Sequence, residues 1–282
     1  MVYVFCAFYG ECSGLIKHYN LKKRQTDKYY RFDVFENENQ PVRIILTGQG
    51  SVMAAAALSG AASFFGIKAE DAIINVGTCA GNYEPGQVFI CNKITEEATG
   101  RTFYPDMILR SGMPERELVT APVVIRKSIH EYANKDSHNM ALYDMEAAAI
   151  YQAANLYVGP HRMGFVKVVS DNGDIEGLTP DFIKGLMAEA VDEIASYVDR
   201  FVADTHDMCR AEESTQFTNQ LCKDLHCSKV MENQVRQLIK YLSLEGTDYM
   251  TYINKLYNEG RLPAHDKKNG KVCLDEIKRE LL

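Results

Sequence analysis

The stretch "ILTGQGSVMAAAALSGAA", residues 45–62, contains the features that decide the fold. An apolar run ends at Gly48, the turn holds a second glycine at Gly50, and a segment rich in alanine follows. This order predicts a buried strand, a tight turn and a helix of small residues that packs closely on a sheet. Because the G-x-G-x-x-G pattern of dinucleotide-binding turns is not met, the turn predicts either close packing alone or helix amides that bind an anion.

The same alternation of strand and helix extends over the first part of the chain. Runs such as "VRIILT" and "GFVKVV" are apolar with little alternation, which is typical of strands covered on both faces. We predict strands at 2–8, 29–36, 42–48, 72–76, 86–95, 117–124, 141–144 and 163–169, and helices at 11–20, 51–65, 146–157 and 180–204. Strands interleaved with helices predict an α/β domain at 1–204, with three αβα layers and a central mixed sheet.

The remainder of the chain, 208–282, differs in character from this domain. It has no clear strand, and apolar residues recur at helical spacing over 230–242 and 249–257. We predict a C-terminal all-helical appendage. It either packs on the sheet domain, shields a dimer edge, or binds a protein partner through the tyrosine-rich face at 249–257.

The composition limits the classes of function. Of the 282 residues, 46% are hydrophobic, which is enough for a sizeable core. A formal net charge of −7 argues against a nucleic-acid surface, because such surfaces depend on Lys and Arg. No apolar run is long enough for a membrane span and the first residues carry no basic leader, so we expect a cytoplasmic protein without a membrane partner. "CKDLHC" (222–227) lacks the second ligand pair of a zinc site, and we expect no metal.

Polar side chains follow the predicted strands, where open α/β sheets bind ligands. "DAIINVGTCAGN" (71–82) carries Thr78 after an apolar run, and "GFVKVVSDNGD" (164–174) ends in Ser170 and Asp171. The glycine loops of 45–62 and 71–82 would both open at the carboxyl ends of the sheet, and together they favour a ligand site there. Asp171 either accepts hydrogen bonds from turn amides or is a positioned proton donor or acceptor.

Three more acids lie near predicted helix starts. Glu11 follows the first strand, and Asp144 and Glu146 flank Met145 in "LYDMEAAAIYQAA" (142–154). Such acids can simply complement a helix dipole, or they can face the hydroxyl groups of a ligand. Lys167 lies within a strand, where an unpaired lysine is rare, and we expect it to project toward Asp144 or Glu146 as a counter-charge.

The segments "NVGTCAG", "YDMEAAAIYQAA" and "VVSDNGD", in this order, resemble those of the nucleoside phosphorylase/nucleosidase superfamily. This group includes purine nucleoside phosphorylases and methylthioadenosine/S-adenosylhomocysteine nucleosidases, and the match spans residues 1 to about 204. The resemblance implies cleavage of the N-glycosidic bond of a purine nucleoside, including 5′-substituted ones such as methylthioadenosine. It also implies a homo-oligomer, for which we expect a dimer, and no cofactor.

The resemblance implies a role for each matching residue. Glu146 would hold the ribose hydroxyls, with Met145 against the sugar face. Asp144 stands where nucleosidases usually have Glu, and it is one methylene shorter. Asp171, beside Ser170, would donate a proton to the base nitrogen, so that the base leaves in a neutral form.

Two further groups of residues complete the implied site. The nucleophile side would contain Thr78, Gly77 and the anion loop at Gly48. On the base side, Val124 in "LVTAPVVIR" (118–126) lies where nucleosidases carry an aromatic ring that stacks on adenine. Either Phe103 or Tyr104 covers the base instead, or the base is a purine other than adenine.

The first loop distinguishes hydrolysis from phosphorolysis. Phosphorylases of the superfamily carry a Gly-Asp-Pro-x-Arg type sequence there, whereas "CAFYGECSGLI" has no Arg or Lys before Lys17. Glu11 would repel phosphate, and the resemblance implies that it is the base that activates water. We therefore predict a hydrolase. The alternatives are a phosphorylase with phosphate as co-substrate, completed by Arg43 or Arg101, and a non-catalytic nucleoside-binding or scaffold protein that acts through its helical tail.

Overall fold

The computed structural model describes residues 1–25, 28–126, 129 and 141–282, with the backbone alone for 206–213. The chain divides into two compact units, Met1–His206 and Asp207–Leu282. None of the helices in the described residues is long and apolar enough to cross a membrane.

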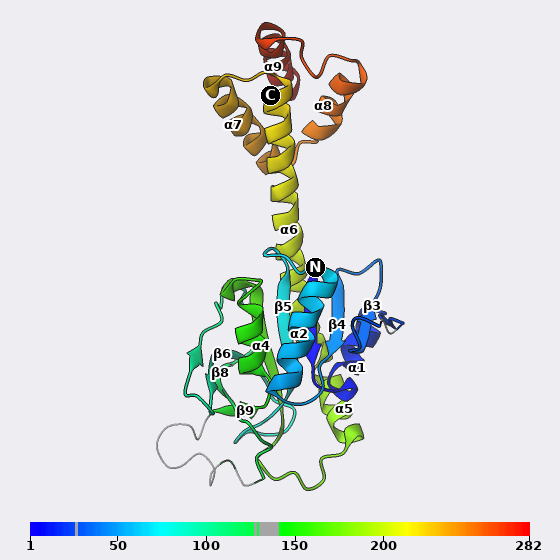
Figure 1. Ribbon diagram of the computed structural model, residues 1–282, viewed down its shortest axis with the longest axis vertical. Coiled ribbons are helices and arrows are strands. Elements are labelled where there is room, and N and C mark those ends of the chain that lie inside the picture. Colours follow the sequence, from blue (N-terminus) through cyan, green and yellow to red (C-terminus); the bar gives the residue numbers. More distant parts are fainter. Residues whose placement is uncertain (26–27, 127–128, 130–140) are drawn as a thin grey trace. The chain divides into compact units, whose positions relative to one another are not determined.

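The first unit contains a mixed sheet, whose described part has ten strands (Figure 1). They are β1 (Val2–Cys6), β2 (Lys22–Lys23), β3 (Val34–Glu36), β4 (Val42–Leu46), β5 (Ala72–Ala80), β6 (Val88–Glu96), β7 (Thr102–Phe103), β8 (Glu115–Thr120), β9 (Leu142–Asp144) and β10 (Met163–Asp171). β1 pairs with β4 and β5 in parallel, and β5 pairs with β10 in parallel. Because β10 also pairs with β6, and β6, β8, β9 and β5 follow as neighbours, these five strands close into a ring.

Side chains of alternate strand residues enter two separate cores, as the pleat of a strand requires. On β1, Tyr3 and Phe5 belong to one core, and Val2 and Val4 belong to the other. The first core is covered by α2 (Ser51–Phe65) and α4 (Ala147–Ala154), and the second by α1 (Tyr9–His18), α5 (Pro180–Glu189) and the first turns of α6 (Val191–Asp224). The predicted three-layer αβα architecture is therefore confirmed.

Small residues bring the first helical layer close to the sheet. In α2 the alanines at 54, 57, 61 and 62 are buried, and in α4 every residue except Gln152 is buried. Figure 1 shows α2 and α4 side by side over the same face. The two alanine-rich stretches of the sequence therefore share one function in packing, which is close contact with the sheet and with each other.

Several predicted boundaries are wrong. The predicted strand at 29–36 is reduced to β3, since only its last residues pair with β4. β5 continues past residue 76 to Ala80 because β10 pairs with it along that length, so the predicted glycine loop at Gly77 and Thr78 is strand. The predicted helix at 180–204 is interrupted at Ala190, where α5 ends and α6 begins.

The second unit is all-helical. It contains the last part of α6 and the helices α7 (Lys229–Glu245), α8 (Tyr249–Asn258) and α9 (Lys267–Leu281). Ser228, Asp248 and Asp266 cap the starts of α7, α8 and α9 with side-chain oxygens. The core of this unit includes Leu225, Val235, Leu242, Ile253 and Leu274, which are almost fully buried. The predicted all-helical appendage is confirmed.

The tyrosine hydroxyls of 249–257 form hydrogen bonds within this unit. The hydroxyl of Tyr257 donates to Asp224 at 2.6 Å, and that of Tyr252 lies 3.4 Å from Glu276. Tyr249 is buried and its hydroxyl lies 3.2 Å from the Ser243 hydroxyl. These contacts favour a packing role for the tyrosine-rich face over the partner-binding role considered for it.

Candidate active site

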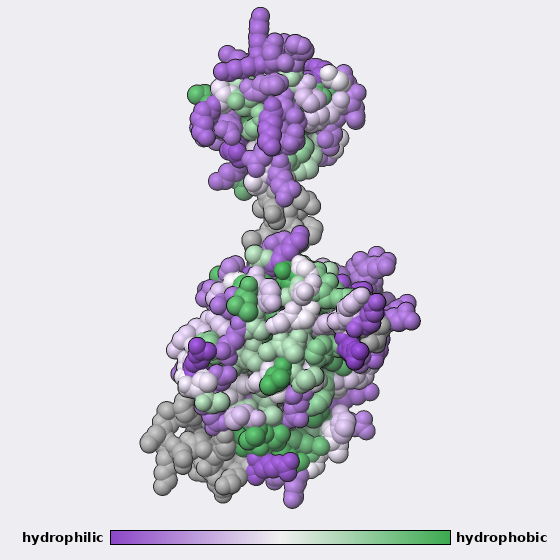
Figure 2. All heavy atoms as spheres, in the orientation of Figure 1, coloured by the Kyte–Doolittle hydropathy of each residue, from purple (hydrophilic) through white to green (hydrophobic). Residues whose placement is uncertain are grey.

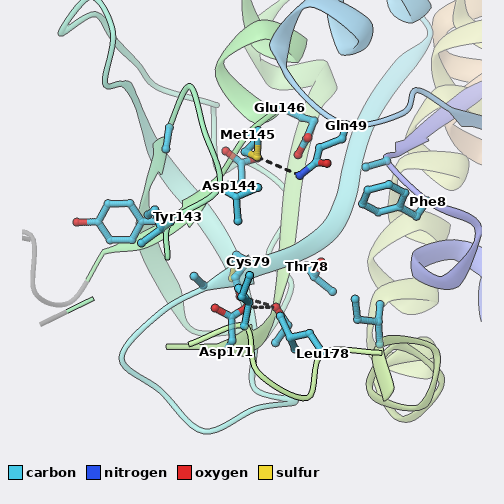
Figure 3. A pocket seen from close by; sticks show the side chains of 18 of the residues that line it. Phe8, Gln49, Thr78, Cys79, Tyr143, Asp144, Met145, Glu146, Asp171 and Leu178 are labelled. Atoms are coloured by element: carbon cyan, nitrogen blue, oxygen red, sulfur yellow. Dashed lines mark hydrogen bonds between the residues drawn. The ribbon is translucent and has the colours of Figure 1, made fainter. Parts of the chain in front are cut away.

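A cavity of about 150 Å³ lies where the ends of β1, β5, β9 and β10 converge. Figure 3 shows side chains from separate segments directed into it. Of the predicted site residues, the cavity is lined by Glu11, Thr78, Val124, Asp144, Met145, Glu146, Ser170 and Asp171. The fold therefore brings together acids that lie up to 160 positions apart in the sequence, from Glu11 to Asp171.

Glu11 is buried at the start of α1 and is held by four donors. Its Oε2 accepts hydrogen bonds from the backbone N–H groups of Ala7 at 2.9 Å and Phe8 at 3.1 Å. Its Oε1 accepts from the N–H and the hydroxyl of Thr78, both at 2.8 Å. These bonds fix the carboxylate across the end of β5.

Glycine at position 77 permits this close approach. A Cβ added to Gly77 would lie 3.1 Å from Oε1 of Glu11, which is closer than ordinary van der Waals contact. Gly77 is not among the residues that line the cavity. The structure therefore places Gly77 behind the Glu11 carboxylate, and not in the ligand-facing loop that the sequence predicted.

Asp144 and Lys167 form a buried ion pair. The Nζ of Lys167 lies 2.8 Å from Oδ2 of Asp144, and the two side chains are 1% and 0% exposed. Burial lowers the pKa of Lys167, but the nearby carboxylates of Asp144 and Glu146 outweigh burial and raise it above its usual value. The expected counter-charge role of Lys167 is confirmed, and Asp144 is its partner.

Two further hydrogen bonds to the Asp144 carboxylate are donated by protein groups. Thr120 donates its hydroxyl to Oδ1 at 2.7 Å, and the N–H of Ala147 donates to Oδ2 at 2.8 Å. Asp144 lines the cavity, but both of its oxygens are engaged with protein donors. This geometry favours a role for Asp144 in the ion pair and at the start of α4. Its expected contact with a ribose hydroxyl stays a prediction.

Glu146 is the buried acid that retains an oxygen for a ligand. Its Oε1 accepts from the N–H of Gly50 at 2.7 Å, and no partner is found for Oε2 in the described part of the chain. Burial, followed by the charge of Asp144, raises the pKa of Glu146 to about 7. The residue directly precedes α4, so the rigid helix start positions it.

The glycine turn at 48–50 provides a backbone hydrogen-bond donor for Glu146. Gly48 and Gly50 have φ values of +75° and +94°, which side-chain-bearing residues rarely adopt. The N–H of Gly48 donates to the carbonyl of Ala7 at 3.1 Å, and Gly48 does not line the cavity. The N–H groups of Gly48 and Gly50 thus bind protein oxygens, which argues against the predicted anion loop.

Asp171 ends β10 on the other side of the cavity. The hydroxyl of Ser170 donates to its Oδ2 at 2.7 Å, and the N–H of Gly173 donates to its Oδ1 at 2.8 Å. Burial raises the pKa of Asp171, and these two hydrogen bonds oppose the rise only in part. The raised pKa favours a protonated Asp171 at higher pH than an exposed aspartate, as a proton donor requires.

The aromatic residues at the cavity differ from the ones expected. Val124 lines the cavity, as predicted, and Phe8 and Tyr143 line it too. Phe103 instead stacks on Tyr151 with ring centroids 5.1 Å apart, and Tyr104 is 60% exposed and outside the cavity. Neither ring lines the cavity, so the structure does not support either of them as the residue that covers the base. Phe8 was missed because an aromatic next to a strand end is usually a core residue.

Gln49 is the other lining residue that the sequence did not reveal. Its Nε2 donates to the Sδ of Met145 at 3.2 Å, and Figure 3 shows this bond across the upper edge of the cavity. The two flanking glycines were the available signal. They indicated an unusual turn, but not which way the side chain between them projects.

The arginines considered for a phosphate site lie elsewhere. Arg43 pairs with Glu36 at 2.7 Å, and Arg101 donates to Gln152 at 3.3 Å. Neither lines the cavity. Within the described residues, no cluster of His, Cys, Asp or Glu is suited to hold a metal ion, and that includes the segment 222–227.

Solved structures with the same fold include proteins named nucleosidase or hydrolase. The 5′-methylthioadenosine/S-adenosylhomocysteine nucleosidase of Neisseria meningitidis superposes with a TM-score of 0.58 and 21% identity, over 70% of this chain and 97% of that one. Futalosine hydrolase of Helicobacter pylori gives 0.58 and 10%, over 71% and 97%. The MTA/SAH nucleosidase of Streptococcus pneumoniae gives 0.56 and 20%, over 71% and 98%.

The chain has the nucleosidase fold. The resemblance found in its motifs is thereby confirmed at the level of the fold. A scan of protein-family models and a search of curated proteins give no match. The activity of this nucleosidase-fold chain is therefore inferred from its own cavity.

Proposed function

We propose that the chain hydrolyses the N-glycosidic bond of a purine nucleoside. The observation that carries the proposal is one cavity lined by Glu11, Glu146 and Asp171, with Glu146 and Asp171 on opposite sides of it (Figure 3). N-glycosidic cleavage passes through a sugar with oxocarbenium character, which nearby carboxylates stabilise. The names of the solved proteins that share the fold, nucleosidase and hydrolase, agree with this chemistry.

Asp171 is the proposed general acid. It donates its proton to a base nitrogen while the bond between that base and C1′ of the sugar breaks, so the base leaves neutral. General acid catalysis typically contributes about 10²–10⁴-fold to the rate. Glu146 accepts hydrogen bonds from the ribose 2′ and 3′ hydroxyls, for which its Oε2 has the capacity, and Met145 lies against the sugar.

Glu11 is the proposed base for the attacking water. A carboxylate has about four lone-pair sites, and four protein donors occupy them. Three of these donors are backbone N–H groups, whereas the fourth is the Thr78 hydroxyl, which can rotate. We propose that this hydroxyl turns toward the ligand, so that water takes its place, gives a proton to Glu11 and forms the bond to C1′.

Water is favoured over phosphate by the charge of the cavity. Glu11, Asp144, Glu146 and Asp171 line it, whereas neither Lys nor Arg does so among the residues that the structure describes. Lys167, which lies behind the wall, is neutralised by Asp144. A phosphate dianion would therefore meet carboxylates without a free cation to offset the repulsion.

The test is to incubate the protein with adenosine, inosine and methylthioadenosine, with and without phosphate. The proposal predicts release of free base and free sugar at the same rate in both buffers. Strict dependence on phosphate, with a sugar 1-phosphate as product, would support the phosphorylase alternative. Tight binding without turnover across a broad panel of nucleosides would support the non-catalytic alternative.

We also propose that the chain forms a homodimer. Val52 and Met53, in the first turn of α2, are 81% and 44% exposed. In Figure 2, weakly polar and hydrophobic residues cover the part of the first unit where α2 lies in Figure 1. Light scattering after gel filtration tests this proposal, because a monomer at micromolar concentration contradicts it.

A further inference from the structure

Gln49 differs from the other polar residues of the cavity in its hydrogen bonds. Its exposed side chain lines the cavity beside Met145 and Glu146, at the end assigned to the sugar (Figure 3). The bond from its Nε2 ends on a thioether, which is a weak acceptor. No partner for its Oε1 is found in the described part of the chain. The amide therefore retains capacity to donate and to accept.

The other polar groups of the cavity wall are engaged with one another. Three pairs account for most of them: Glu11 with Thr78, Asp144 with Lys167, and Ser170 with Asp171. Glu146 keeps one oxygen, which the proposed function assigns to the 2′ and 3′ hydroxyls of the ribose. Gln49 is thus a second group at the sugar end that can still form hydrogen bonds to a ligand.

The position of Gln49 relative to Glu146 is fixed by the turn that carries it. The N–H of Gly50 donates to Glu146 at 2.7 Å, and the hydroxyl of Ser51 donates to the carbonyl of Met145 at 3.0 Å. These bonds tie the residues on the C-terminal side of Gln49 to the segment that holds the ribose acid. A sugar bound to Glu146 is therefore presented to Gln49 in a defined orientation.

We propose that Gln49 is a specificity-determining residue that hydrogen-bonds the 5′ hydroxyl of the nucleoside. The inference rests on the proposed function, because it follows from assigning the 2′ and 3′ hydroxyls to Glu146; the 5′ hydroxyl is the one that remains on a ribonucleoside. The chain then prefers substrates with a 5′ hydroxyl over 5′-deoxy or 5′-alkylthio nucleosides. Since Gln49 is exposed, water satisfies the amide when the hydroxyl is missing, and the preference is about 10-fold.

The test measures binding without catalysis. Formycin A is an adenosine isostere whose glycosidic bond is a C–C bond and cannot be hydrolysed. Its affinity, and those of its 5′-deoxy and 5′-methylthio derivatives, are measured by calorimetry, with the hypoxanthine-like formycin B series in parallel. The proteins are wild type, Gln49→Leu and the control Gln40→Leu, which makes the same change in the turn before β4 and outside the cavity.

Wild type and Gln40→Leu are expected to bind the 5′-hydroxyl compounds about 10-fold more tightly than the 5′-deoxy compounds, and Gln49→Leu is expected to bind both about equally. Equal affinities in wild type, or a preference that survives in Gln49→Leu, would overturn the inference. Absence of turnover with the binding preference intact would refute hydrolysis and leave the role of Gln49 standing. Failure of every compound to bind would overturn both.

Discussion

Among single residues, Glu146 is an acid whose ionisation the fold opposes. Burial, then the negative charge of Asp144, raises its pKa to about 7 from the ordinary 4.5. The folded chain therefore keeps the proton of Glu146 to a higher pH than the unfolded chain does. Its contribution to stability is complete below pH about 4.5 and is lost as the pH rises through about 7.

Glu146→Gln is predicted to become more stable relative to wild type as the pH rises. Glutamine does not titrate and keeps an oxygen for the N–H of Gly50. Between pH 5 and pH 8 the difference in unfolding free energy should shift in favour of the variant by about 2.5 kcal/mol. Urea denaturation at both pH values measures it, with the exposed Glu38→Gln as control. A difference that does not change with pH contradicts a raised pKa at Glu146.

At the scale of elements, β5 must approach α1 closely for Glu11 to reach Thr78. Gly77→Ala adds a Cβ 3.1 Å from the Glu11 carboxylate, which must move by a few tenths of an ångström. We expect kcat/KM to fall about 10-fold, because small displacements of a reacting group are costly. The unfolding free energy should change little.

The matched control for this change is Gly185→Ala in α5, where an added Cβ meets no atom within 4 Å. It should leave kcat/KM unchanged and stabilise the helix by about 0.5–1 kcal/mol. Equal kcat/KM values for Gly77→Ala and wild type would show that the placement of Glu11 does not limit turnover.

The ion pair between Asp144 of β9 and Lys167 of β10 joins two strands of the closed ring. Lys167→Met removes the cation and leaves a carboxylate whose side chain is 0% exposed. We expect a loss of about 3–5 kcal/mol of unfolding free energy, because the remaining charge is buried without its partner. The double variant with Asp144→Asn should recover part of that loss. A single variant within about 1 kcal/mol of wild type would argue against the pair as a structural element.

The sequence predicted the elements better than the site. β1, β4 and α2 were predictable because their apolar runs and glycines act locally. β5 was underestimated because its last residues are polar or small, and only pairing with β10 makes them strand. Asp144 and Glu146 were identified together, but the sequence could not separate them, since their roles depend on Lys167 and Gly50 in other elements.

In the molecule as a whole, the described residues that line the cavity all belong to the first unit. They lie between Ala7 and Ile183, and the second unit has its own core. A chain that ends at residue 206 is therefore predicted to fold and to keep kcat/KM within about threefold of the full chain. Circular dichroism and nucleoside turnover measure this. A folded fragment without activity would assign the second unit a part in catalysis.

The proposed hydrolysis depends on protonation of the leaving base by Asp171. This step is tested by the rate of purine release in phosphate-free buffer by wild type and by Asp171→Asn, with the fold of both checked by circular dichroism. Asparagine keeps the shape of the side chain but has no carboxyl proton to give. Wild type is expected to turn over, and the kcat of the variant is expected to be lower by about 10²–10⁴-fold. Equal rates in the two proteins would refute the role of Asp171.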